Sequence, residues 1–164
     1  GQIVQNVAGN LADFGIVSEL PPGAGLRFQP FRRDRLMLVL PLRHAWAEQS
    51  ALHFIDALDE TFVGLHADSA LQHRLLRAAA DAGRELKLGV RVTSFDAVCA
   101  MVAAGLGIGV IPATAAEPYR SSGRILAIEL SDDWAWRALY LCSRSEGTLP
   151  AAAQRLFDHL AGPD

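Results

Sequence analysis

Residues 61–112, TFVGLHADSALQHRLLRAAADAGRELKLGVRVTSFDAVCAMVAAGLGIGVIP, alternate short apolar runs with longer segments of helical spacing. The predicted strands are residues 61–65, 88–93 and 108–111, and the predicted helices between them are residues 70–82 and 95–105. Ser69-x-x-Gln72 and Thr93-x-x-Asp96 match the capping boxes that open helices. Strand–helix–strand–helix–strand with short links predicts a parallel sheet joined by right-handed crossovers, and therefore an α/β protein.

The segments on either side of this stretch are less regular. The elements predicted there are the remainder of a helix at residues 1–10, strands at 13–17, 36–40, 125–130 and 138–142, a loop at 21–25, and a last helix with Pro150 in its first turn. The charged run RRDR at residues 32–35 is predicted to lie in a solvated loop. Trp134 and Trp136 lie between two predicted strands, where exposure and burial are both open. The N-terminal part holds too few elements for a packed layer, so we expect a piece of something longer.

Composition excludes several classes of function. The 164 residues are 51% hydrophobic and carry a formal net charge of −3, so no basic surplus is available to neutralise a phosphate backbone. The apolar runs are too short to span a bilayer, and the sequence does not start like a secretory signal. Cys99 and Cys142 form neither a disulfide framework nor a zinc spacing, which favours a reducing, cytoplasmic setting and two buried thiols.

The residues offer little for catalysis. Gly105-Leu-Gly-Ile-Gly109 has the letters of a dinucleotide fingerprint, but these glycines end a predicted helix and precede a strand, so we interpret them as a helix end. His66, Asp68 and His73 lie near the first capping box without the spacing of metal ligands. No Gly-x-Ser-x-Gly elbow surrounds a serine in this region. We therefore assign no catalytic residue, no metal site and no cofactor.

Binding is better supported than catalysis. The segments His66–Ser69 and Thr93–Ser94 each follow the carboxyl end of a predicted parallel strand and open a helix. Ligands of open α/β sheets bind at that edge, and free backbone N–H groups at helix starts favour an anion. The hydroxyls of Ser69, Thr93 and Ser94 would add donors. The alternative that these residues only cap their helices stays open.

Four stretches together resemble the effector-binding domain of LysR-type transcriptional regulators. They are residues 10–17 (NLADFGIV), 34–47 (DRLMLVLPLRHAWA, with Ala45 where the family usually has proline), 92–98 with 102–112 (VTSFDAV and VAAGLGIGVIP), and 138–144 (ALYLCSR). The resemblance implies a type II periplasmic-binding-protein fold, in which two α/β subdomains are joined by two crossing strands. Residues 38–143 would form the second subdomain. Residues 1–37 and the returning segment 144–164 would belong to an incomplete first subdomain, whose opening strand–helix–strand, normally upstream in the family, is absent here.

The family implies a function as well as a fold. Its domains are bacterial, cytoplasmic and not enzymes; they bind a small, often anionic metabolite and relay the change to a dimeric or tetrameric protein on DNA. DNA would be contacted only through an N-terminal winged helix-turn-helix that this sequence lacks. The residues that match the family's ligand cleft are His66, Asp68, Ser69, Thr93, Ser94 and Phe95. The helix at residues 70–82 is a candidate dimer interface.

Two alternatives share the implied fold. One is a solute-binding or periplasmic sensor protein, which an export signal upstream would reveal. The other is an enzyme similar to porphobilinogen deaminase or to a dehydratase, which would need a nucleophile or base with a perturbed pKa in the cleft.

Overall fold

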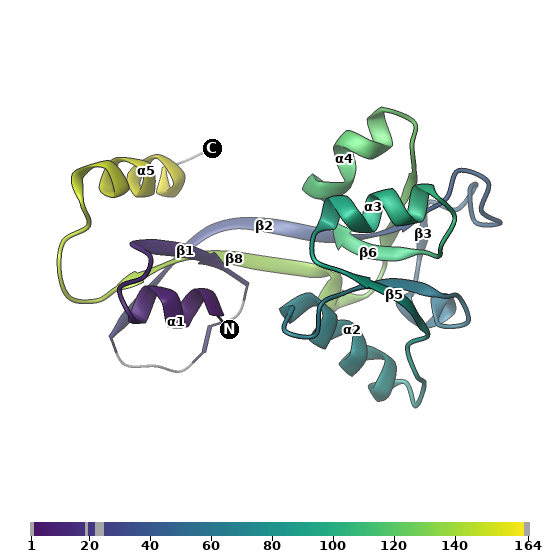
Figure 1. Cartoon of the computed structure of the whole chain (residues 1–164), viewed down its shortest axis with the longest axis horizontal. Coiled ribbons are helices and arrows are strands. Elements are labelled where there is room, and N and C mark those ends of the chain that lie inside the picture. Colours follow the sequence, from purple (N-terminus) through teal and green to yellow (C-terminus); the bar gives the residue numbers. More distant parts are fainter. Residues whose placement is uncertain (1, 19, 22–24, 163–164) are drawn as a thin grey trace. The chain divides into compact units, whose positions relative to one another are not determined.

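The computed structural model describes residues 2–18, 20–21 and 25–162, and the chain divides into two units (Figure 1). Unit 1 comprises residues 1–34 and 137–164, and unit 2 comprises residues 35–136. The predicted subdomain limits at residues 37/38 and 143/144 fall inside β2 (Leu26–Leu40) and β8 (Trp136–Arg144). These two strands carry the chain from one unit to the other. Residues 22–24 of the predicted loop and residue 1 of the predicted helix lie outside the described residues.

Unit 2 combines part of a six-stranded sheet with a two-stranded parallel sheet, and helices cover both. Its other elements are β3 (Ala51–Leu52), the 3-10 turn Phe54–Ala57, β4 (Phe62–Leu65), α2 (Ala70–Asp81), β5 (Leu88–Val92), α3 (Phe95–Ala103), β6 (Gly109–Pro112), α4 (Ala113–Ser121), β7 (Leu126–Leu130) and the 3-10 turn Asp133–Ala135. The last residues of β2 pair antiparallel with both β6 and β7, and β7 pairs in parallel with β3. β4 pairs in parallel with β5. The predicted strands and helices of residues 61–112 are thus confirmed, within one or two residues at their ends.

Backbone hydrogen bonds join the two halves of this unit. The Val63 N–H donates to the Ile108 carbonyl at 2.8 Å, and the Ile108 N–H donates to the Thr61 carbonyl at 2.9 Å. The bridge between Phe62 and Ile108 is parallel. β5, β4 and β6 therefore run in the same direction, as the crossover argument predicts.

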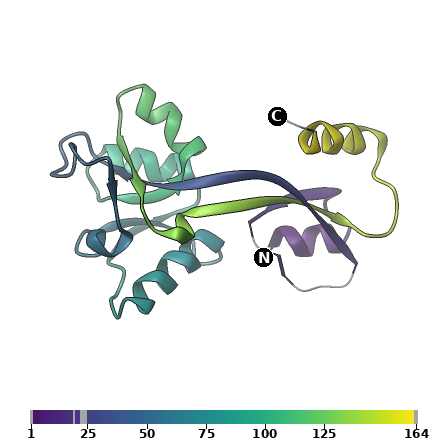
Figure 2. The ribbon, with the colours of Figure 1, turned by 180° about the vertical axis from the view of Figure 1, so that it is seen from behind.

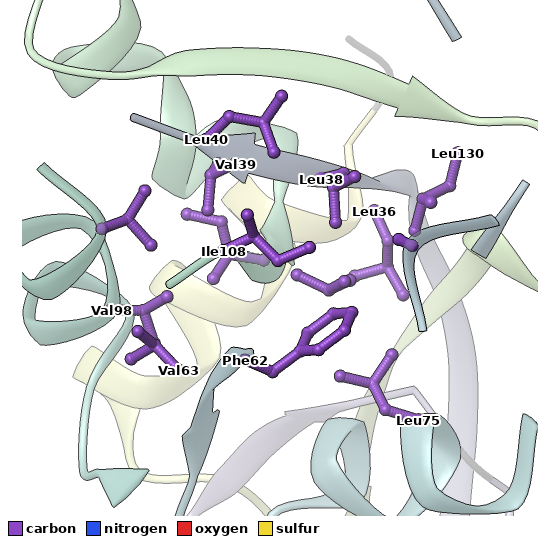
Figure 3. Close-up of a cluster of buried hydrophobic side chains, with 14 of the residues drawn as sticks. Leu36, Leu38, Val39, Leu40, Phe62, Val63, Leu75, Val98, Ile108 and Leu130 are labelled. Carbon is purple, nitrogen blue, oxygen red and sulfur yellow. The ribbon is translucent and has the colours of Figure 1, made fainter. Parts of the chain in front are cut away.

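A single apolar core fills unit 2. β2 contributes Leu36, Leu38 and Leu40, which are fully buried, and Phe62 of β4 lies among them. Figure 3 shows these side chains together with Leu75 of α2, which comes from the helix that covers β4. Because burial of each such side chain stabilises the fold by roughly 1.5–3 kcal/mol, this core holds the sheet and its helices in place.

The glycine-rich segment between α3 and β6 is a helix end followed by a close approach. Gly105 ends α3 with a φ of +79°. Gly107 has a φ of +144°, and a Cβ there would collide with the Thr61 carbonyl. The segment opens no helix, because it leads directly into β6. The interpretation as a helix end, rather than a dinucleotide loop, is confirmed.

One prediction about local structure is wrong, and one helix is missed. The strand expected at residues 36–40 begins at Leu26, so the run at residues 32–35 lies in β2 and not in a solvated loop. Alternation marks the start of the strand: Leu26 and Phe28 are half-buried and alternate with exposed Arg27 and Gln29, a pattern that Pro30 and the charges after it obscure in the sequence. The helix α4 was not expected, because Pro118 lies inside it. Its alanines favour a helix strongly enough to tolerate one proline.

Unit 1 is smaller and is built from both ends of the chain. Its elements are α1 (Gln2–Ala8), β1 (Phe14–Val17), the first part of β2, β8 and α5 (Ala151–Ala161). β1 pairs antiparallel with β8, and β8 is the neighbour of β2, as Figure 2 shows. Its buried cluster comprises only Val7, Val17 and Cys142 among the described residues, with Phe157 of α5 against Phe14 at 5.5 Å. The helices and strands predicted for this part are present, and they pack around a small core.

Candidate functional site

The parallel register of β4 and β5 brings two polar segments to one edge of the unit 2 sheet. Leu65, the last residue of β4, is the register partner of Val92, the last residue of β5. His66 and Thr93 come next in the chain, so the segments 66–69 and 93–95 both begin at this edge. α2 and α3 then start from these segments.

The first segment ends in a helix cap that differs from the predicted capping box. The Ser69 hydroxyl accepts from the Gln72 backbone N–H at 3.4 Å, as expected. The Gln72 carboxamide, however, reaches past Ser69 and accepts from the Leu65 N–H at 2.9 Å. The Ser69 N–H donates instead to the His66 carbonyl at 3.1 Å. Gln72 therefore ties the end of β4 to the first turn of α2.

The second helix begins at Phe95 as predicted, but its N-cap lies one residue later than the capping box implies. The N-cap of α3 is Ser94 and not Thr93, and its hydroxyl accepts from the Ala97 N–H at 3.2 Å. Asp96 does not close a capping box either. Its carboxylate accepts from the Tyr119 hydroxyl at 3.1 Å, which links α3 to α4.

The predicted ligand residues differ in how accessible they are. His66, Asp68, Thr93 and Ser94 are exposed, whereas Ser69 and Phe95 are half-buried. Phe95 packs against the apolar core, so only part of its ring remains at the surface. Each capping serine accepts one hydrogen bond and retains its own O–H as a donor. The edge therefore presents hydroxyl donors beside two helix starts, where the helix dipole favours negative charge.

Sequence reasoning missed two contributors near this edge. α4 is a third helix that follows a strand parallel to β4, and its N-cap, Pro112, makes no side-chain cap. A proline ahead of an alanine-rich run could have indicated it. The burial of Gln72, which the capping box names only as a cap, is the second: the residue is 1% exposed, and its Nε2 lacks a hydrogen-bond partner within the described structure. No pattern in the sequence reports burial of that amide.

Reactive chemistry is poorly represented in unit 2 and unit 1 alike. Across residues 2–18, 20–21 and 25–162, no three His, Cys, Asp or Glu side chains gather as a metal site would require. Cys99 and Cys142 are free and buried, as the sequence predicts. Burial raises the pKa of the Cys99 thiol to about 11 and also raises the pKa of Cys142, so both are protonated and unreactive at neutral pH. In the same ranges, none of the helices is long and apolar enough to cross a membrane.

Comparison with known proteins decides the family. The model of the LysR substrate binding domain matches residues 1–162. The chain belongs to this family. This LysR substrate-binding domain is 26% identical over 151 residues to the HTH-type transcriptional regulator MJ0300 of Methanocaldococcus jannaschii, covering 90% of the chain and 51% of that protein. It is 24% identical to the RuBisCO operon transcriptional regulator of Allochromatium vinosum, covering 92% of the chain and 50% of that protein. The chain thus spans about half the length of these relatives, which are transcriptional regulators.

Solved structures agree on the fold. The CcmR regulatory domain of Synechocystis PCC6803, in complex with 2-PG, matches with a TM-score of 0.85 at 21% identity, covering 98% of this chain and 77% of that one. The effector-binding domain of QuiR, in complex with shikimate, matches with a TM-score of 0.82 at 18% identity, covering 98% and 75%. This LysR substrate-binding domain therefore has the type II periplasmic-binding-protein-like fold, as the resemblance implies.

Proposed function

We propose that this domain is the effector-sensing part of a bacterial transcriptional regulator, and that a small anion binds at the edge formed by residues 66–69 and 93–95. The observation that carries the proposal is the parallel register of Leu65 with Val92, which brings two serine-capped helix starts to one edge. Binding at this edge is the rule for open α/β sheets. The structural neighbours named with 2-PG and shikimate support a small-molecule ligand.

Charges beside the edge refine the class of ligand. Asp68 directly precedes the Ser69 cap, and Asp96 lies in the first turn of α3. Carboxylates accept hydrogen bonds but repel a second anionic group. A ligand with one acidic group at the helix starts and hydroxyl groups facing Asp68 and Asp96 fits both features. We therefore propose a hydroxylated acid as the effector.

A paired substitution tests the anion site without removing the helix cap. Asp and Asn cap helices about equally well, so Ser94→Asp and Ser94→Asn keep the cap of α3 and differ only in charge. Binding of 2-PG, shikimate, citrate and inorganic phosphate is measured by titration calorimetry. For any anion that binds, we expect Ser94→Asp to weaken the affinity about tenfold or more relative to Ser94→Asn, which is about 1.4 kcal/mol.

The outcomes separate the function from the site. Equal affinities of the two variants for a bound anion would place its site elsewhere. If none of the four anions binds the unmodified domain but an uncharged polyol or a cation does, the anionic class is wrong. The same pair of substitutions at Ser69 provides an independent check at the start of α2.

We further propose that the full-length protein contacts DNA through a separate domain, works in the cytoplasm as a dimer or tetramer, and catalyses no reaction. The outer face of α2, which exposes Leu76, is the proposed pairing surface. Leu76→Asp should dissociate the full-length oligomer in light scattering, whereas Leu106→Asp, at a comparably exposed position outside α2, should leave it intact. An unchanged mass for Leu76→Asp would exclude this face.

A further inference from the structure

The limit between the two units falls at adjacent positions on β2 and β8. On β2, unit 1 ends at Asp34 and unit 2 begins at Arg35; on β8, unit 2 ends at Trp136 and unit 1 resumes at Arg137. β2 and β8 are neighbours in the sheet. These four side chains therefore stand where the chain twice crosses from one unit to the other.

The unit 1 side of this limit holds a buried ion pair. The Arg137 Nη2 atom pairs with the Asp34 Oδ2 atom, and the two side chains are 12% and 7% exposed. Removing one partner of a buried pair leaves the other charge without compensation, so such a pair resists separation strongly. The pair therefore links the last unit 1 residue of β2 to the first unit 1 residue of β8 after the crossing.

The unit 2 side holds a second link. The Arg35 guanidinium lies over the Trp136 ring, 4.8 Å from its centre. The same guanidinium pairs with Glu129 at 2.6 Å and donates to the Leu130 carbonyl at 3.3 Å, so it also holds β7. Successive residues of a strand point to opposite faces of the sheet. Asp34 and Arg35 thus tie β2 to β8 on both faces.

Neither link is saturated with hydrogen bonds. Within the described residues, three buried side-chain atoms lack a partner, and two of them are the Nε atoms of Arg35 and Arg137. A buried donor without a partner is costly and calls for a specific explanation. Each arginine therefore keeps one unpaired donor beside its link at the crossing.

We propose that Asp34, Arg35, Trp136 and Arg137 form a strand clamp, which restricts the twist of β2 and β8 and thereby the range of orientations that the two units can adopt. The strand clamp involves none of the proposed ligand residues. It goes beyond the proposed function and requires no effector. A ligand that favours one orientation would act against the resistance of this clamp, so the clamp sets how readily the domain responds.

Spin-label distance measurements on the ligand-free chain test the proposal. Labels are attached at Gln5→Cys in α1 and Ala103→Cys at the end of α3, two exposed positions in different units. The native cysteines are buried, so the reagent reacts at the introduced sites. We expect Asp34→Asn and Trp136→Ala each to broaden the distance distribution by about 1.5-fold or more, because fewer contacts hold the crossing.

Three further variants make the result decisive. The charge-reversed pair, Asp34→Arg with Arg137→Asp, should return the distance distribution to nearly the width of the unmodified chain. Trp136→Phe should leave the width unchanged, because the ring contact with Arg35 persists. The matched control is Glu117→Gln, which breaks an exposed ion pair with Arg120 inside α4 and should change nothing. Trp136 is 54% exposed, so its alanine variant is expected to fold even if the Asp34 variants do not. A distance distribution for Trp136→Ala as narrow as that of the unmodified chain, or equal broadening by Glu117→Gln, would refute the strand clamp.

Discussion

Replacing Gly107 by alanine should detach β6 from β4 and destabilise unit 2 severely. A Cβ at this position would lie closer to the Thr61 carbonyl oxygen than the 3.0 Å that real Cβ atoms respect. The next atoms it meets are the Thr61 carbonyl carbon at 3.1 Å and the Val63 nitrogen at 3.6 Å. All three are backbone atoms, so no side chain can rotate away, and the strands themselves must separate.

The cost follows from two contributions. Forcing a side chain into a φ of +144° costs about 1–3 kcal/mol. Displacing the Thr61 carbonyl also breaks its bond from the Ile108 N–H, and a buried donor left unpaired costs about 1–3 kcal/mol. Together they predict a loss of about 2–6 kcal/mol in the free energy of unfolding, against a total of roughly 5–15 kcal/mol for a typical protein.

Gly105→Ala is the matched control. Gly105 also has a positive φ, +79°, but a Cβ there meets nothing within 4 Å. Its alanine variant should be destabilised only by the left-handed backbone conformation, which costs about 1–2 kcal/mol. The comparison isolates the collision with Thr61 from the backbone conformation.

Urea unfolding followed by tryptophan fluorescence measures the difference. The Trp134 ring lies 5.3 Å from the ring of Phe54 inside unit 2, so its emission reports the unfolding of this unit. Gly107→Ala should unfold at a clearly lower urea concentration than Gly105→Ala. Free energies of unfolding that agree to within about 0.5 kcal/mol would refute the argument that Gly107 is required for β6 to approach β4.

Three other perturbations have defined outcomes. Leu38→Ala should cost about 2–5 kcal/mol in urea unfolding because the side chain is fully buried, whereas Leu106→Ala, at a 54% exposed position, should cost under about 0.5 kcal/mol. Gln72→Ala should cost about 1–3 kcal/mol by the same measurement, because the Leu65 N–H loses its acceptor; a neutral result would show that water replaces the amide. Burial keeps the Cys99 thiol protonated in the fold to about pH 11, against 9.0 when unfolded, so stability should fall as the pH rises through that interval. Thermal melts of Cys99→Ala, which should show a shallower decline than the unmodified chain, check that assignment.

The sequence predicts the centre of the fold well because local and global preferences agree there. Residues 61–112 contain apolar runs of strand length, hydroxyl residues at helix starts and glycines at helix ends, and each of these signals concerns neighbours in the chain. These signals could therefore be interpreted without knowledge of contacts between residues far apart in the sequence. The same local logic places segments 66–69 and 93–95 at one edge, since parallel strands end together.

The errors arise where distant contacts decide. Arg35 lies in a strand because Glu129, Leu130 and Trp136 are near it in space, and none of them is near it in sequence. The Gln72 carboxamide bonds to the Leu65 N–H rather than completing the capping box, because the end of β4 offers a buried donor. Propensity cannot report partners that only the folded sheet supplies.

The different make-up of the two units has a consequence for synthesis on the ribosome. Unit 2 is one uninterrupted stretch, so its core can close while the end of the chain is still being made. β1 must wait for β8, because Phe14 pairs with Ser143, and the ribosome adds only about 5–20 residues per second. β1 therefore leaves the ribosome several seconds before the strand that pairs with it, β8. During that time its open edge is available to chaperones, or to another nascent chain.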